Sequence, residues 1–174
     1  MLISEIYKRL YDFTLAATSY EPSKIIIANQ STPRPKKPFI TISASSFKNI
    51  ATPIIKKLDD IGLQEITVSM VFTASFQAFS DVLHEAEDVL GTLYIKFATE
   101  LQNDVFKGDL ALLRTLKNVT AIPAALNEQI ESRAMLDLEI GFNKSTTYQV
   151  GLIEHLYLTD TRLNKEYIIN KLEN

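Results

Sequence analysis

The sequence predicts an α+β domain, in which a mainly antiparallel sheet is flanked by an N-terminal helix and a long central helix. Three observations predict it. Residues 2–17 place apolar side chains at steps of three and four, as one face of an amphipathic helix does. Residues 64–78 and 133–142 alternate apolar with polar residues, which is typical of strands buried on one face. A second helical pattern, at residues 80–101, follows the first alternating stretch.

The first third of the chain is expected to form a helix, an extended arm and a strand. The helix is expected to end before Tyr20-Glu21-Pro22, and the apolar run Ile25-Ile26-Ile27 is of uncertain type. Three prolines within residues 28–38 fix the backbone φ angle and remove hydrogen-bond donors, so this segment is predicted to be an arm or loop. Residues 39–44 alternate as a strand, whereas residues 45–62 fit either type.

The central helix is predicted to begin at Ser80, whose hydroxyl suits an N-cap, with Asp81 and Glu85 near the positive helix end. Gly91 lies inside this helix at a cost of about 1 kcal/mol against alanine, which indicates a close approach of another backbone. A shorter helical piece is expected at residues 109–116. The apolar stripe of the central helix consists of Leu83, Ala86, Leu90, Leu93, Phe97 and Leu101.

The last third is expected to hold strands, turns and a helical tail. Its expected elements are a short strand at 119–122, a helical turn at 124–131, a strand at 133–142, a turn at 144–146 and a strand at 148–159 that completes a hairpin. Apolar residues at helical spacing predict a C-terminal helical tail at about residues 163–173. With no internal repeat, residues 1–174 are expected to form one domain.

The side chains that usually carry catalysis are sparse. No familiar catalytic or cofactor motif occurs, and the absence of cysteine excludes disulfides, thiolate metal ligands and a cysteine nucleophile. His84 has acidic neighbours, but their spacing matches no zinc motif, and His155 is expected at a surface or interface. The carboxylate pairs at residues 59–60 and 137/139 have no companion that favours catalysis. We therefore expect no enzyme activity, no cofactor and no metal.

Neither a membrane nor nucleic acid is expected as the main partner. The N-terminal residues lack the basic and apolar regions of a signal peptide, and no apolar run approaches the roughly 20 residues of a spanning helix. The net charge of −3 provides no overall basic surface for nucleic acid. A soluble protein of the cytoplasm is expected.

One charge feature stands out between residues 22 and 58. This stretch carries seven of the 18 basic residues and none of the 21 acidic ones. Three interpretations are open: pairing with an acidic face of a neighbouring copy, which we favour, a solvated loop, and contact with a DNA backbone. Glu131 and Arg133 flank the start of a strand and are predicted to pair within or between subunits. The candidate subunit-interface residues are Arg34, Lys36, Lys37, Lys56, Lys57, Asp81, Glu85, Asp88, Glu131 and Arg133.

Five short segments carry a resemblance to a known family. In chain order they are Pro38-Phe39-Ile40-Thr41-Ile42, Phe76-Gln77-Ala78-Phe79-Ser80, Ile122-Pro123, Glu131-Ser132-Arg133-Ala134-Met135-Leu136-Asp137-Leu138 and Gly151-Leu152-Ile153-Glu154. Each is weak alone, but their order and spacing over about residues 38–158 resemble the tail (neck) terminator proteins of tailed phages. Ser80 stands where that family usually has glycine, and the segment after Arg162 has no counterpart in the resemblance.

The resemblance implies a structural subunit of the virion, assembled in the host cytoplasm, without catalytic residues. It implies a homo-oligomeric ring, commonly a hexamer, that caps the tail tube and joins it to the head–tail connector. DNA would pass through the ring without specific binding. A ring needs heterologous contacts that close, and the polar strand face with Thr67, Ser69, Thr73 and Ser75 is a further candidate for them. The alternatives are another phage neck or minor tail component and a non-viral α+β module that binds a peptide or small ligand.

Overall fold

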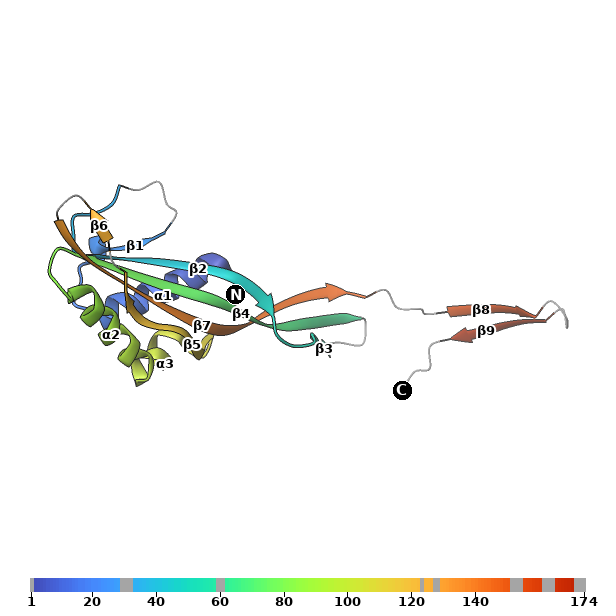
Figure 1. The fold of residues 1–174 in the computed structure, drawn as a ribbon. Coiled ribbons are helices and arrows are strands. Elements are labelled where there is room, and N and C mark those ends of the chain that lie inside the picture. Colours follow the sequence, from blue (N-terminus) through green and yellow to red (C-terminus); the bar gives the residue numbers. More distant parts are fainter. Residues whose placement is uncertain are drawn as a thin grey trace. The chain divides into compact units, whose positions relative to one another are not determined.

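The computed structural model describes most of the chain, and Figure 1 labels its helices and strands. The chain divides into two compact units. The described residues are 2–28, 33–58, 62–122, 124–126, 129–150, 155–160 and 165–170, and side chains are described in 2–28, 33–58, 62–122 and 131–150. The first unit joins Met1–Thr52 to Val68–Lys144. The second unit joins Pro53–Thr67 to Ser145–Asn174.

The first unit is built on a mixed, mostly antiparallel sheet with the strand order β1-β2-β4-β7-β5, in which β1 and β2 run parallel. The strands are β1 Ile25–Ile27, β2 Phe39–Asn49, β4 Leu63–Ser80, β5 Leu110–Ala121, the short β6 Ala124–Leu126 and β7 Gln129–Gln149. The helices are α1 Ile3–Ala17, α2 Glu85–Phe97 and α3 Glu100–Phe106, with a short 3₁₀ turn at Pro22–Lys24. The predicted α+β class is confirmed.

The core lies between the helices and the face of the sheet that the alternating patterns predicted. Along β4 the buried residues include Phe72, Ala74, Phe76 and Ala78, and along β7 they are Ala134, Leu136, Leu138, Ile140 and Phe142. From α1, Phe13 enters an aromatic cluster, with its ring centroid 4.1 Å from that of Phe97 and 5.3 Å from that of Phe106. Burying each such side chain stabilises the fold by about 1.5–3 kcal/mol, so this apolar face decides how the sheet and helices pack.

The structure describes part of the arm and part of residues 45–62, whose secondary structure the sequence did not decide. Residues 33–38 form no helix or strand, as predicted, whereas residues 29–32 lie outside the described part. The strand predicted at 39–44 continues as β2 to Asn49, with a register shift between Ser45 and Lys48. Ser46 has a φ of 56° within this irregularity, which is why the alternation becomes unreadable there.

The described part of the second unit is strand structure. β3, Ile54–Lys57, pairs antiparallel with residues 64–67 of β4, and all four of its residues are exposed. The Tyr148 hydroxyl donates to Oε1 of Gln64 at 2.8 Å, and the Thr67 and Ser145 hydroxyls are 2.8 Å apart. β8, His155–Asp160, and β9, Lys165–Asn170, form a separate antiparallel two-stranded sheet.

The central helix is shorter than predicted. Ser80 is the last residue of β4 and not the N-cap, because α2 begins at Glu85 after a turn in which His84 has a φ of 63°. The helix also ends at Phe97, so Leu101 belongs to α3. Leu83 is 61% exposed and therefore lies outside the core stripe.

Four further predictions were wrong, each because strand pairing overrode a local pattern. Residues 110–116 belong to β5, which pairs with β7 through three register shifts, so a strict alternation of apolar and polar residues is not needed there. The described residues of 124–131 are strands β6 and β7. β7 runs through the predicted turn at 144–146 as far as Gln149, so the predicted hairpin with 148–159 does not form, and residues 155–160 are β8, which pairs with β9. The helical tail expected at 163–173 is strand β9 in its described part.

Candidate assembly surface

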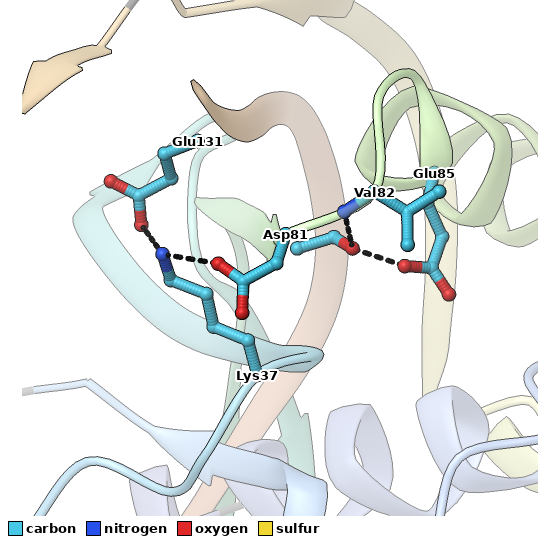
Figure 2. Close-up of polar contacts among 6 residues, drawn as sticks. Lys37, Asp81, Val82, Glu85 and Glu131 are labelled. Carbon is cyan, nitrogen blue, oxygen red and sulfur yellow. Dashed lines mark hydrogen bonds and ion pairs between the residues drawn. The ribbon is translucent and has the colours of Figure 1, made fainter. Parts of the chain in front are cut away.

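Lys37, at the end of the predicted arm, is the centre of an ion-pair cluster within the chain (Figure 2). Its Nζ lies 3.0 Å from Oδ1 of Asp81 and 3.1 Å from Oε1 of Glu131. Lys37 shortly precedes β2, Asp81 follows β4 and Glu131 lies near the start of β7, so the antiparallel sheet brings all three to one end. The Glu131 side chain is only 11% exposed, whereas that of Asp81 is 71% exposed. The Lys37–Glu131 pair is therefore the better shielded from solvent.

The two carboxylates stabilise the charged form of Lys37. Its hydrogen bond to Asp81, followed by that to Glu131, raises the pKa of the lysine above its usual value. Because the folded-state pKa is raised, the stabilisation is fully present below the ordinary lysine pKa of about 10.4 and is lost as pH rises through the folded value. The cluster is thus intact at every pH near neutrality.

The turn between β4 and α2 is held by the buried hydroxyl of Ser80. This oxygen accepts a hydrogen bond from the Val82 backbone N–H at 2.9 Å and donates to Oε2 of Glu85 (Figure 2). Burial, together with the nearby charge of Glu85, raises the pKa of Tyr20 to about 12, so that phenol stays neutral. Because it accepts the hydrogen bond from Ser80, the Glu85 carboxylate already has a partner within its own chain.

Glu131 and Arg133, predicted to pair with each other or across subunits, have separate partners within the chain. Nη2 of Arg133 donates to Oε1 of Gln77 at 2.8 Å, and the guanidinium carbon lies 5.0 Å from the ring centroid of Phe79. Phe79 in turn stacks on Phe39, with their centroids 4.6 Å apart. This cation–π stack joins β2, β4 and β7 beside the Lys37 cluster.

A second charged cluster, on the sheet face away from the core, was not predicted as a site. Oε2 of Glu139 accepts from Nε of Arg114 at 2.7 Å, and Lys48 Nζ lies 3.4 Å from Oε1 of the same carboxylate. The hydrogen bond from Arg114, opposed by desolvation, lowers the pKa of Glu139. Opposite charges on facing strand residues predict such a pair. That prediction could not be made here, because the leucine spacing of residues 109–116 predicts a helix instead of a strand.

The other candidate interface residues are not members of these clusters. Arg34 and Lys36 are exposed in the arm, where the Lys36 carbonyl accepts a hydrogen bond from Lys24 Nζ. Lys56 and Lys57 are exposed on β3 of the second unit. Asp88 is exposed on α2. The structure thus brings together Lys37, Asp81 and Glu131, with Glu85 on the same turn and Arg133 beside them, and the other five candidates are not part of this cluster.

Little catalytic chemistry is visible in the described part of the chain. No group of three or more metal-ligating side chains occurs among the described residues. His84 Nδ1 lies 3.3 Å from Oε1 of Glu87 in an exposed position, and the His155 side chain and residues 59–60 lie outside the described part. Among the described helices, none is long and apolar enough to cross a membrane.

Comparison with protein families identifies the family of this fold. The family model described as phage neck terminator protein matches residues 4–166, which includes both clusters and almost the whole chain. This chain belongs to the phage neck terminator family. Among curated proteins, no match was found. The family is one of structural proteins of the virion and not one of enzymes, so this terminator-family chain is a phage structural component.

The segments that carry the resemblance converge in the terminator fold. The segment that starts at Pro38 directly follows Lys37. Residues 76–80 are the last residues of β4, and residues 131–138 lie in the first half of β7. These three places supply Lys37, Asp81 and Glu131. The recognisable sequence of this neck protein therefore surrounds the ion-pair cluster at one end of its sheet. The segment Gly151–Glu154 and the residue Pro123 lie outside the described part.

Proposed function

We propose that the chain is the subunit of a closed homo-oligomeric ring, a hexamer, that caps the phage tail tube and joins it to the head–tail connector. Residues 1–174 act as one terminator domain, the ring assembles in the host cytoplasm, and DNA passes through its opening without specific contacts. Membership of the neck terminator family over residues 4–166 is the observation that carries the proposal.

Exposed apolar side chains support an assembly function. A closed ring of identical copies needs two different surfaces on each copy that fit each other. Large apolar side chains are exposed on at least three elements: Ile54 and Ile55 on β3, Ile95 on α2, and Leu113 and Leu116 on β5. Contacts between copies would remove this surface from water, which stabilises association.

The charged candidate residues divide into two groups under this proposal. Lys37, Asp81, Glu85, Glu131 and Arg133 shape one end of each subunit through contacts within the chain. The exposed Arg34, Lys36, Lys56, Lys57 and Asp88 are proposed to contact neighbouring copies or the tube and connector. Substitutions in the first group should act through subunit stability, and those in the second group through assembly alone.

Light scattering over a wide concentration range, combined with negative-stain images, tests the ring. Closed rings of uniform size, or rings that form when tail tubes are added, are expected. A protein that remains monomeric in both settings contradicts the proposal and favours the alternative of a ligand- or peptide-binding module. Open filaments would point to another tail component with heterologous contacts that do not close.

A further inference from the structure

The outer face of α2 contains a glycine that nothing in the described part of the chain requires. Asp88, Gly91, Thr92 and Ile95 share this face, opposite the buried Leu90 and its neighbours. A glycine within a helix makes that helix less stable than an alanine would. Glycine is usually needed where φ is positive or where a neighbouring group approaches closely. Gly91 has a helical φ, and a Cβ built on it meets nothing within 4 Å. The close neighbour that we expected at Gly91 is therefore not found among the described residues.

The same face is apolar at one end and acidic at the other. Ile95 is 65% exposed. Asp88 is exposed, and its carboxylate makes no hydrogen bond or ion pair with the described residues, whereas Glu85 bonds Ser80 and Glu87 accepts from Ser132. With a rise of 1.5 Å per residue, Asp88 and Ile95 lie about 10 Å apart along the helix. Between them Gly91 leaves the helix backbone open to close approach.

Strand β3 presents the complementary pattern. Ile54 and Lys56 alternate onto one face of this exposed strand, and Ile54 is 66% exposed. Ile54 and Lys56 lie about 7 Å apart along the strand, which is less than the spacing of Asp88 and Ile95 along the helix. The long, flexible lysine side chain is able to cover the difference. Glu65 faces Lys56 across the β3–β4 register, and its neutralising effect is small because a cross-strand pair with an exposed lysine is weak.

We propose that β3 of one copy docks on the outer face of α2 of the next copy, with Ile54 against Ile95 and Gly91 and with Lys56 beside Asp88. The inference rests on the proposed ring and names one of its contacts. Because the two surfaces differ, the contact is heterologous and repeats around the ring. A single strand on a helix buries less than the roughly 800 Å² per partner of a stable complex, so it acts together with other contacts of the ring.

Cysteine cross-linking tests the contact directly, because the native chain contains no cysteine. Ile54→Cys and Thr92→Cys variants are purified separately, mixed, assembled and oxidised. The proposal predicts a disulfide between two different copies, identified by mass spectrometry. Ala16→Cys, at an exposed position of α1, replaces Thr92→Cys in the control and should give little cross-link with Ile54→Cys.

The outcomes separate this contact from the ring itself. Rings that form with no Ile54–Thr92 cross-link, or with equal cross-linking to Ala16→Cys, overturn the docking and leave the ring standing. A native chain that never assembles overturns both.

A charge swap provides an independent second test. Asp88→Lys and Lys56→Asp are each expected to weaken assembly by about tenfold, since each places like charges together, and the double variant should recover most of the loss. Gly91→Leu should fold but assemble poorly, while Ala16→Leu should assemble normally. Additive losses in the double charge variant, or normal assembly of Gly91→Leu, contradict the proposed contact.

Discussion

At the scale of single residues, Lys37 joins three chain segments that are far apart in the sequence. It contacts the residue after β4 and a residue near the start of β7, and so fixes the end of the arm against the sheet. Ion pairs at a surface contribute little, but Glu131 is mostly buried and would lose its cationic partner without Lys37. The contribution of the cluster should therefore come mainly from the Lys37–Glu131 pair.

Replacing Lys37 with methionine tests this contribution. We expect Lys37→Met to lower the free energy of unfolding by about 1–2 kcal/mol, because the Glu131 carboxylate is left shielded and unpaired. Urea unfolding at neutral pH is the measurement. Arg34→Met, which changes an exposed arm residue, is the control and should shift stability by less than about 0.5 kcal/mol. Equal effects of the two variants would mean that the cluster does not stabilise the fold.

The Arg114–Glu139 pair predicts a pH dependence. The pKa of Glu139 is lowered in the folded chain, chiefly by its hydrogen bond from Arg114. Its stabilisation is therefore present above the unfolded glutamate pKa of about 4.3 and is lost as pH falls through the lower folded value. Glu139→Gln should be less stable than the native chain at neutral pH, and the difference should shrink below about pH 4 in urea unfolding. A difference that stays constant with pH would contradict the assignment.

At the scale of elements, two glycines with equally open surroundings should respond in opposite ways to alanine. A Cβ added at Gly91 or at Gly108 would meet no atom within 4 Å, but Gly108 has a φ of 77°. Gly91→Ala should raise the free energy of unfolding by about 1 kcal/mol, because alanine favours the helix. Gly108→Ala should lower it by about 1 kcal/mol, because alanine is strained at that φ. Thermal or urea unfolding measures both, and the same sign of change in both variants would contradict this explanation.

The elements also show why sequence patterns predicted some of the fold and not the rest. The alternation in residues 64–78 and 133–142 survives because each stretch has one face in the core, as buried Phe76 and Leu138 show. β5 pairs only with β7 among the described strands, and because of its register shifts a strict alternation is not needed there, so its leucine spacing predicted a helix. At the β4–α2 turn, Ser80 has the chemistry of a cap, but its hydroxyl is used five residues before the helix starts.

The three residues of the Lys37 cluster were among the ten candidates from the sequence, but their pairing could not be predicted. Charge segregation and position single out Lys37, Asp81 and Glu131, yet their convergence depends on the order of three strands. No local pattern encodes that order. Arg114 and Glu139 were missed for the related reason that their contact exists only once β5 is a strand.

At the scale of the whole molecule, the family membership and the physical chemistry of the chain agree on a structural protein. The sheet, its helices and both charged clusters lie within the matched residues 4–166. Exposed isoleucines on β3 and α2 would remain in water in a single copy, although their burial favours association. We therefore expect this chain to complete a tail by assembling on its end.

Electron microscopy of isolated tail tubes, imaged before and after addition of the purified protein, tests this expectation most directly. We predict one ring at a single end of each tube and a tube length that no longer grows when free tube protein is supplied. Tubes with bare ends that continue to elongate, in the presence of folded protein, would contradict it.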